Sequence, residues 1–309
     1  MNIEHTIALL TCWYGDYPWY FPYFIKSCSY NPTIDFIIVT DNKEVIPHKP
    51  ANVILIDKSL EELKAEASKK LGFDLNFDSA YKFCDLKPAF GFFFQDIFEK
   101  YDFWGHGDID MVYGDIRGFI TPCILNNYDI INSSQNFITG TFCLYRNNNL
   151  MRNLFMESRD YQKVFAAPEY LGFDECDFLF QKLRRPGVTI FDFPDNIQSM
   201  TYIVRKAEAE GRIKPLFEFY LFQTISNRIR WDNGLIIYAN KMECLFYDMI
   251  KYKKLCKEKT VTYPIPEIFY FNKKGINKNS YWKLLSLKMI AKWRYFQNNA
   301  NFSIKTTKS

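Results

Sequence analysis

The stretch Tyr101-Asp-Phe-Trp-Gly-His-Gly-Asp108-Ile-Asp110 decides how the fold of this chain is interpreted. Its apolar and small residues predict a buried strand over residues 103–107, and two carboxylates at positions i and i+2 follow that strand directly. Ligands of open α/β sheets bind beyond the carboxyl ends of the strands. Carboxylate oxygens there suit Mg²⁺ or Mn²⁺, and such an ion neutralises a diphosphate. The alternative is a solvated turn in which an aspartate caps the next segment; the aromatic residues and glycines before Asp108 favour function.

Strands and helices are expected to alternate on both sides of this stretch. Further strands are expected over residues 7–12, 36–40, 53–56, 129–132 and 141–146, and helices over residues 63–71 and 89–100. A capping box formed by Ser59 and Glu62 supports the first helix, and Gly72 ends it. Pro88 suits the start of the second helix. This alternation predicts an α/β fold in which a mostly parallel sheet is covered by helices on both faces.

The second half of the chain is less regular. Helices are expected over residues 150–164 and 174–183, and strands over residues 189–191, 235–238 and 244–247. Beyond residue 250 the composition shifts to Lys, Tyr and Trp, and Pro264 and Pro266 predict an irregular connection. We therefore expect an α/β domain over residues 1–255 and a basic, aromatic, helical extension over residues 256–309.

The composition argues against several classes of protein. A net charge of +4 and a pI of 8.4 are too mild for a nucleic-acid-binding domain. No stretch reaches the ~20 apolar residues that span a bilayer, and the first residues lack the basic segment of a secretion signal. The eight cysteines are scattered without a CxxC pair, which favours reduced thiols in a cytoplasmic protein over a zinc ribbon. The aromatic share is high at 18%, and aromatic side chains stack on sugar rings, bases and lipid interfaces.

The expected extension carries an aromatic stripe. Apolar residues recur at spacings of three and four, which places on one face of a predicted helix Trp282, Leu285, Met289, Trp293 and Phe296. Basic residues lie off that face: Lys283, Lys288 and Arg294. A helix of this kind suits a membrane interface. Packing on the main domain or on a second copy of the chain is the alternative.

Several segments together resemble the bacterial GT-A-type glycosyltransferases of surface-polysaccharide synthesis. The most specific part runs from Tyr81 to Asp115 and contains Lys82-Phe-Cys-Asp85-Leu-Lys87-Pro88-Ala-Phe-Gly91, the stretch quoted first, and Gly114-Asp115. Three further segments are similar to that family: Thr11–Gly15, Ile34–Asp41 and Thr139–Arg146. The resemblance covers residues 5–255 and implies a GT-A catalytic domain over residues 1–255.

The resemblance also implies a donor site. In such enzymes the Asp-x-Asp pair holds a divalent metal, Mn²⁺ or Mg²⁺, on the diphosphate of a nucleotide-sugar. Asp110 would contact the metal, and Asp108 would contact the metal or the ribose. The residues expected to bind the nucleotide-sugar are Thr11, Trp13, Tyr14, Asp41, Asp85, Lys87, Asp108 and Lys251. For Asp85 and Lys87, a capped helix end with an exposed lysine is the structural alternative.

Asp174 and Glu175 are the candidate catalytic residues. An inverting transfer needs a carboxylate that removes the proton of the acceptor hydroxyl while the metal-bound diphosphate leaves. Two adjacent acids in an apolar frame can raise one pKa toward the useful range, and the resemblance places the base in such a pair. A helix N-terminus that favours acids for its dipole is the alternative. Which of the two acids acts stays open.

Asp248 stands where the resembling enzymes carry a histidine that completes the metal shell. The stretch reads Leu245-Phe-Tyr-Asp248-Met-Ile-Lys251-Tyr-Lys253-Lys254. A carboxylate is a competent third ligand for Mg²⁺ or Mn²⁺, and the nearby lysines can offset its charge. The alternative is that Asp248 caps a turn. The histidines lack metal-ligand spacing: His5, His48 and His106.

We therefore expect a metal-dependent glycosyltransferase of the hexosyltransferase type. It would move a sugar from a nucleotide donor, with a UDP-sugar favoured, to a glycan or lipid-linked glycan acceptor, with inversion favoured. We expect it in the cytoplasm, with peripheral attachment to the inner face of the membrane as an option. Two alternatives stay open: a nucleotidyltransferase that acts on sugar phosphates and releases pyrophosphate, and a non-catalytic glycan-binding protein.

Overall fold

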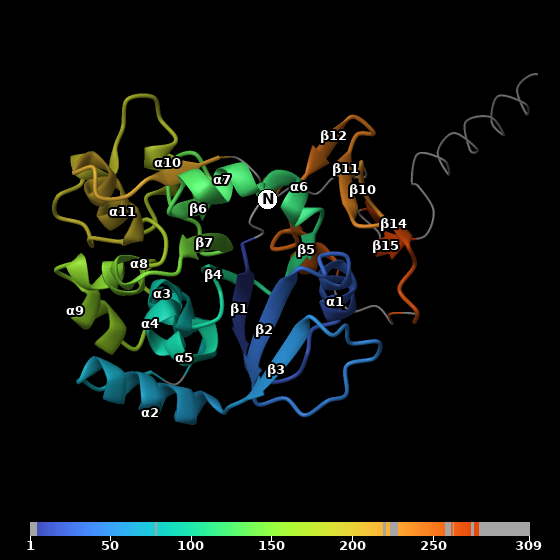
Figure 1. The fold of residues 1–309 in the computed structure, drawn as a ribbon, viewed down its shortest axis with the longest axis horizontal. Helices are drawn as coiled ribbons and strands as arrows, with labels where there is room; N and C mark the ends of the chain where they lie inside the picture. Colours follow the sequence, from blue (N-terminus) through green and yellow to red (C-terminus); the bar gives the residue numbers. More distant parts are fainter. Residues whose placement is uncertain are drawn as a thin grey trace, which may run out of the picture.

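The structure is a computed structural model of the 309-residue chain. It describes residues 5–77, 79–218, 221–222, 228–256, 261, 263–272 and 275–277. These residues form one seven-stranded sheet, two smaller sheets and helices that pack on both sides of the large sheet (Figure 1).

The seven-stranded sheet is mixed and mostly parallel, in the order β3-β2-β1-β4-β7-β6-β8. Its strands are β1 (Ile7–Trp13), β2 (Ile34–Thr40), β3 (Val53–Asp57), β4 (Phe103–Gly107), β6 (Ile130–Asn132), β7 (Phe142–Arg146) and β8 (Pro215–Phe217). Strands β3, β2, β1 and β4 are parallel, as are β6 and β8, whereas β7 is antiparallel to both of its neighbours. The carboxyl ends of β1, β2 and β4 therefore lie at one edge of the sheet, where Asp108 follows β4.

Strand β1 shows why the apolar runs of the sequence become central strands. Ile7 and Leu9 belong to the apolar core on one face of the sheet, and Ala8 and Leu10 belong to the core on the other face. Side chains alternate between the two faces of a strand, so a continuous apolar run fits a strand that is buried on both. The prediction of a mostly parallel sheet is confirmed, although β7, over Phe142–Arg146, is antiparallel.

Helices cover one face of the large sheet (Figure 1). They are α2 (Leu60–Leu71), α3 (Phe83–Leu86), α4 (Phe90–Phe93), α5 (Gln95–Phe98), α8 (Asn149–Asn153), α9 (Tyr161–Ala166) and α11 (Met200–Ala209). Helix α2 begins as predicted, because the Ser59 hydroxyl accepts the Glu62 N–H and the Glu62 carboxylate accepts the Ser59 N–H at 2.8 Å. It ends at Gly72, whose φ of 79° is left-handed.

The other face of the sheet is covered by α1 (Phe21–Ser29) and the two smaller sheets (Figure 1). One has the order β5-β13-β9, with β5 (Met111–Tyr113), β9 (Leu221–Phe222) and β13 (Phe246–Asp248). The other has the order β12-β11-β10-β14-β15, with β10 (Ile229–Asp232), β11 (Leu235–Tyr238), β12 (Met242–Cys244), β14 (Ile268–Asn272) and β15 (Gly275–Asn277). Strand β14 lies in the expected extension and pairs with β10. Because β13 pairs with β5, the segment after residue 248 lies beside Asp110.

Two long predicted helices are divided into shorter pieces. The segment over residues 88–100 forms a 3₁₀ turn (Lys87–Ala89), α4 and α5. The segment over residues 150–164 forms α8, a 3₁₀ turn (Leu154–Glu157) and α9. The second break occurs at Ser158, whose backbone is extended and whose hydroxyl donates to the Gln198 carbonyl at 2.7 Å. The prediction of one continuous helix is wrong in both places.

Two further predicted elements are wrong. Within residues 174–183, only α10 (Phe180–Leu183) is helical, and Asp177 and Phe178 have left-handed φ angles of 51° and 58°. The Asp177 carboxylate accepts hydrogen bonds from Asn196 Nδ2 at 2.6 Å and from the Ile197 N–H at 3.1 Å. The expected strand over residues 189–191 is a 3₁₀ turn (Ile190–Asp192), because the Thr189 N–H bonds the Asp192 carboxylate.

The aromatic stripe over residues 282–296 lies outside the described residues. Within the part of the chain that the structure describes, no helix has the length and apolar character to cross a membrane.

Candidate functional site

A cavity of about 400 Å³ lies at the carboxyl ends of β1 and β4. Its lining brings together residues that are far apart in the sequence: Thr11 to Tyr14, Tyr81, Lys87, Asp108 to Asp110, Gly140, Tyr170, Asp174, Glu175 and Lys253. Four carboxylates and two ammonium groups therefore face one cavity. The edge of the sheet at which they meet is the one that the position of Asp108 after a buried strand predicts.

Asp108 is held in place from the sheet and from the 3₁₀ turn at Lys87. Its N–H donates to the Thr141 carbonyl at 3.1 Å. The Lys87 ammonium donates to Asp108 Oδ1 at 2.6 Å and to the Gly140 carbonyl at 2.8 Å. Lys87 thus ties the turn after β4 to the connection between β6 and β7.

Asp110 is buried, with 5% of its surface exposed, and is held by the segment after β13. The Met249 N–H donates to its carbonyl at 2.9 Å. The Lys253 ammonium, from α12 (Tyr252–Leu255), pairs with its Oδ2 at 2.6 Å. Each carboxylate of the Asp-x-Asp pair therefore has its own lysine partner.

The acid pair Asp174 and Glu175 lies across Gly140 from Asp108. The Gly140 N–H donates to Glu175 Oε1 at 2.9 Å. The Tyr170 hydroxyl donates to Asp174 Oδ1 at 2.9 Å and lies 3.4 Å from Glu175 Oε2. A Cβ atom at Gly140 would overlap the Asp174 carboxylate, so only glycine allows this approach.

Burial and mutual repulsion control the charges in the cavity. Burial and the Glu175 carboxylate raise the pKa of Asp174 well above its ordinary value, and Lys87 opposes this effect. Burial also raises the pKa of Glu175, and the Gly140 N–H opposes it. Burial raises the pKa of Asp108 as well, with Lys87 lowering it and Asp110 raising it. The cavity therefore holds carboxyl groups that exchange protons closer to neutral pH than free ones do.

The expected nucleoside-binding residues lie at the ends of β1 and β2. Thr11 donates to the Gly107 carbonyl at 2.5 Å, which fixes β1 beside the start of the Asp-x-Asp turn. Trp13 and Tyr14 line the cavity with Thr11. Asp41 instead accepts the Gly15 N–H at 3.0 Å and borders a shallow depression beside the cavity. Its bond holds the loop after β1.

Like Asp41, three further residues expected at the site do not line the cavity. Asp85 is fully buried, pairs with Lys82 at 2.8 Å and accepts the N–H groups of Leu171 and Phe173. It therefore supports the segment that carries the acid pair. Lys251 is exposed at the start of α12.

Asp248 is the third of these residues. It is buried at the end of β13, where its backbone is in register with Met111 of β5, and its Oδ1 accepts the Ile250 N–H at 2.7 Å. This bond matches the turn-capping alternative. His106 is buried within β4, and burial lowers its pKa well below the ordinary value, so the ring is neutral.

The Asp-x-Asp pair fits a divalent cation that is shared with a substrate. Asp108 and Asp110 supply hard oxygen atoms at one cavity wall, and Mg²⁺ in proteins commonly uses one or two carboxylates together with substrate phosphates. Within the described residues, no three His, Cys, Asp or Glu side chains are grouped closely enough to hold a metal ion. The donor set therefore suits a metal–diphosphate complex rather than a cage built by the protein alone.

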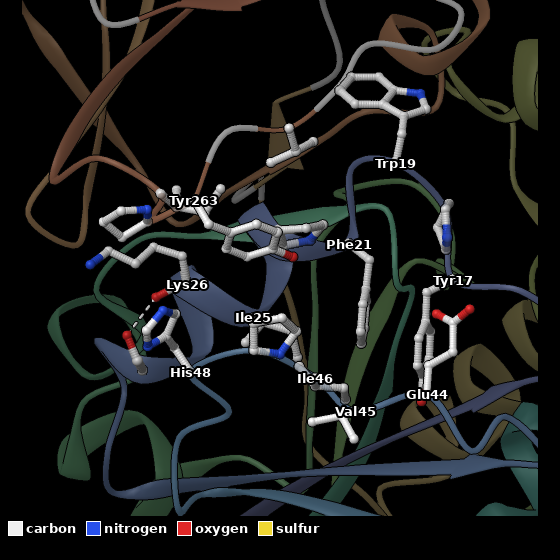
Figure 2. Close-up of a pocket in the computed structure, with 17 residues that line it drawn as sticks. Tyr17, Trp19, Phe21, Ile25, Lys26, Glu44, Val45, Ile46, His48 and Tyr263 are labelled. Atoms are coloured by element: carbon white, nitrogen blue, oxygen red, sulfur yellow. Dashed lines mark hydrogen bonds between the residues drawn. The ribbon is translucent and has the colours of Figure 1, made fainter.

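A second cavity, of about 530 Å³, lies between α1 and two loops, residues 44–48 and 263–265 (Figure 2). It is lined mainly by aromatic, aliphatic and proline side chains, and in Figure 2 the rings of Tyr17 and Phe21 lie face to face, 4.1 Å apart. Its lysine, Lys26, is paired with Glu267 at 2.6 Å. We place the chemistry in the smaller cavity because its carboxylates and lysines converge there.

Sequence reasoning missed two residues at the site. Lys253 pairs with Asp110, although the pattern of the sequence points equally to Lys251 and Lys254. Tyr170 bonds the acid pair, and no local motif marks it. Both contacts depend on tertiary packing. The sequence alone shows only a cluster of lysines after residue 250 and an isolated tyrosine.

Comparisons with known proteins give one family and a remote structural likeness. A family model described as "Family of unknown function (DUF6625)" matches residues 9–283. No curated protein matches the chain significantly. Among solved structures, a galactosyltransferase, LgtC, in complex with donor and acceptor sugar analogues matches with 13% sequence identity and a TM-score of 0.36. That match covers 70% of this chain and 75% of the other chain.

Proposed function

We propose a function for this chain, which belongs to the family of unknown function DUF6625, from the groups that its cavity brings together. The chain is a glycosyltransferase that moves a sugar from a nucleoside-diphosphate donor to a hydroxyl of a glycan acceptor. One observation carries this proposal: the Asp-x-Asp pair and a second acid pair of raised pKa face the same cavity and are linked through Lys87 and Gly140.

The donor side of the cavity suits a diphosphate. Lys87 and Lys253 supply two ammonium groups at the turn after β4. Four carboxylates line the same space, so negative charge is in excess and a diphosphate needs a further cation. Mn²⁺ or Mg²⁺ held by Asp108 and Asp110 would supply that charge and stabilise the leaving diphosphate.

The acceptor side suits a general base. One carboxylate of the pair, Asp174 or Glu175, removes the proton of the acceptor hydroxyl. The hydroxyl oxygen then forms a bond to the anomeric carbon, and the bond between that carbon and the diphosphate oxygen breaks with its electrons leaving on the diphosphate. A base whose pKa is raised toward the working pH is the more effective one. A base opposite the leaving group gives inversion at the anomeric carbon.

The finer assignments rest on sequence resemblance. A uridine nucleotide is the proposed donor, with Thr11, Trp13 and Tyr14 against the nucleoside. A role in surface-polysaccharide synthesis is proposed for the same reason, with a glycan or lipid-linked glycan as the acceptor.

Thermal shift with a panel of nucleoside diphosphates and nucleotide-sugars, with and without Mn²⁺, tests the proposal. A specific ligand binds only the native state and raises the melting temperature. UDP or a UDP-sugar should stabilise the chain, and turnover with an acceptor should release free nucleoside diphosphate. Release of pyrophosphate would instead identify a nucleotidyltransferase, and the absence of nucleotide-dependent stabilisation would favour a glycan-binding protein.

A further inference from the structure

A row of three aromatic rings leads from solvent to the acid pair. Tyr81, on the 3₁₀ turn Ala80–Lys82, is 65% exposed, and its ring centroid lies 5.1 Å from that of Tyr170 at an interplanar angle of 71°. Phe178 is 53% exposed, and its ring centroid lies 5.6 Å from that of Tyr170 at 87°. The Tyr170 ring therefore contacts two exposed rings.

The row is joined to the proposed chemistry through Tyr170. Its hydroxyl bonds Asp174, and both Tyr81 and Tyr170 line the cavity that contains the acid pair. Among the described residues, the aromatic side chains classed as exposed are Tyr81, Phe178, Phe191 and Tyr263. Two of them contact one ring beside the candidate base, which single exposed residues scattered at random would not do.

The segment that carries Phe178 is held in an unfavourable conformation. Asp177 and Phe178 both have left-handed φ angles, which are unfavourable for residues with a side chain. The bonds from Asn196 and Ile197 to the Asp177 carboxylate maintain this conformation, and it leaves the Phe178 ring exposed next to Tyr170. Strain that keeps a large apolar ring in solvent indicates a ligand for that ring.

The aromatic rings of Tyr81, Tyr170 and Phe178 suit one class of ligand, a sugar. The face of an aromatic ring carries negative charge density and attracts the C–H groups on the apolar face of a pyranose. The hydroxyl groups of the same sugar are hydrogen-bond donors, which suit the carboxylates of Asp174 and Glu175 beside Tyr170. Three rings beside two carboxyl groups therefore match a sugar that is bound by its C–H face and presents a hydroxyl to the base.

We propose that Tyr81, Tyr170 and Phe178 form the acceptor platform, which binds a pyranose of the acceptor glycan. The assignment of this sugar as the acceptor rests on the proposed glycosyl transfer. The platform lies on the acid-pair side of the cavity, whereas Lys253 and Asp110 lie on the donor side, so loss of the exposed rings weakens acceptor binding and leaves nucleotide binding unchanged.

Saturation-transfer NMR on the full chain tests the platform. The probes are the methyl β-glycosides of glucose, galactose and N-acetylglucosamine, with irradiation of the protein's aromatic protons and detection on the sugar C–H protons. At least one glycoside should receive saturation, and Tyr81→Ala and Phe178→Ala should each weaken its affinity about three- to ten-fold. Tyr81→Phe, which keeps the ring, should bind like the wild type.

The matched control is Phe191→Ala. Phe191 is 44% exposed and contacts Tyr202 instead of the acid pair. Its removal should leave the sugar signal unchanged, and a signal that falls equally in this variant would overturn the platform. Absence of saturation with all three glycosides would also overturn it.

A parallel measurement separates this inference from the proposed function. UDP binding in the presence of Mn²⁺ is measured by calorimetry on the same samples. Normal UDP binding without sugar binding would overturn the platform and leave the glycosyltransferase proposal intact. Ring-dependent sugar binding without UDP binding would support the platform as a sugar site and overturn the transferase.

Discussion

The cavity contains more acidic than basic side chains. Its four carboxyl groups belong to Asp108, Asp110, Asp174 and Glu175. Lys87 and Lys253 supply two ammonium groups in the apo chain. Burial raises the pKa of both Asp174 and Glu175, and the Glu175 carboxylate raises the pKa of Asp174 further. The group that acts as base must be ionised when the acceptor binds, and its raised pKa then makes it a stronger base than a free carboxylate.

The raised pKa of Asp174 predicts a pH-dependent stability. The carboxyl group binds its proton more tightly in the folded chain than in the unfolded chain, so its contribution to stability is full below about pH 4 and is lost as the pH rises through the folded pKa. Asp174→Asn resembles the protonated acid and keeps an acceptor for Tyr170. The variant should be more stable than the wild type at pH 8 and equally stable near pH 4.

Thermal melting of both proteins from pH 4 to pH 9 measures this difference. Asp195→Asn, at an exposed aspartate, is the control and should show no such divergence. If the melting temperatures of the wild type and Asp174→Asn change equally with pH, the buried Asp174 carboxyl group does not bind a proton more tightly in the folded chain. The same variant should lose transfer activity by about 10²-fold or more if Asp174 is the base.

Lys253 and Lys251 are separated by one residue but have different surroundings. Lys253 pairs with buried Asp110, and the desolvation of its ammonium is outweighed by that carboxylate, which raises its pKa. Lys253→Met should weaken UDP binding about ten- to hundred-fold, the range for loss of one charge-assisted contact to a phosphate. Lys251→Met, at an exposed position, should change it little.

Calorimetry of UDP with Mn²⁺ on the two variants decides between these lysines. An effect confined to Lys251→Met would restore the assignment that sequence resemblance implies. Equal affinities in both variants and the wild type would place the diphosphate elsewhere.

At the scale of single elements, the sequence predicts those strands and helix ends that depend on interactions between neighbouring residues. The apolar runs of β1 to β4 and the capping box of α2 are visible in the sequence because the residues responsible are neighbours. The turn at Asp177 is invisible, because its hydrogen-bond donors come from Asn196 and Ile197. The 3₁₀ turn after Thr189 is a different case. Thr189 and Asp192 form a short-range cap, but the strand propensity of residues 189–191 predicts a strand.

The connection between β6 and β7 contains the tightest approach at the site. A Cβ at Gly140 would overlap Asp174 Oδ2 and meet Glu175, so Gly140→Ala must displace the acid pair. We expect a loss of about 1–3 kcal/mol in unfolding free energy, as for other overpacked positions, together with loss of transfer activity. UDP affinity should change less, because Asp110 and Lys253 do not contact this residue.

Denaturant unfolding and UDP calorimetry on Gly140→Ala test this expectation. A variant that keeps full stability and full transfer activity would mean that the acid pair is not held against Gly140.

At the scale of the whole molecule, the position of the cavity was predictable and its lining only in part. The carboxylates after β4 indicate the edge of the sheet where the cavity lies, because parallel strands share their carboxyl ends. The acid pair reaches that edge through a loop fixed by Asp85, and Lys253 reaches it because β13 pairs with β5. These positions depend on how distant segments pack together, and no local pattern in a single sequence predicts them.

The amphipathic pattern of residues 282–296 predicts attachment to anionic membranes. Tryptophans at the interface and lysines near headgroups, each worth about 1 kcal/mol, would bind the chain peripherally. Co-sedimentation with liposomes that contain anionic lipid should be strong for the full chain and lost when residues 278–309 are deleted. Failure of the full chain to bind these liposomes would assign the stripe to packing.

The most direct test of the central claim is calorimetry of UDP in the presence of Mn²⁺ on the wild type and on Asp110→Asn. The substitution is isosteric and removes one charge from the Asp-x-Asp pair, so the fold should persist, with a melting temperature close to that of the wild type. The account predicts measurable Mn²⁺-dependent UDP binding by the wild type and none by Asp110→Asn. Unchanged UDP affinity in the folded variant would contradict the assignment of this cavity as the donor site of a glycosyltransferase.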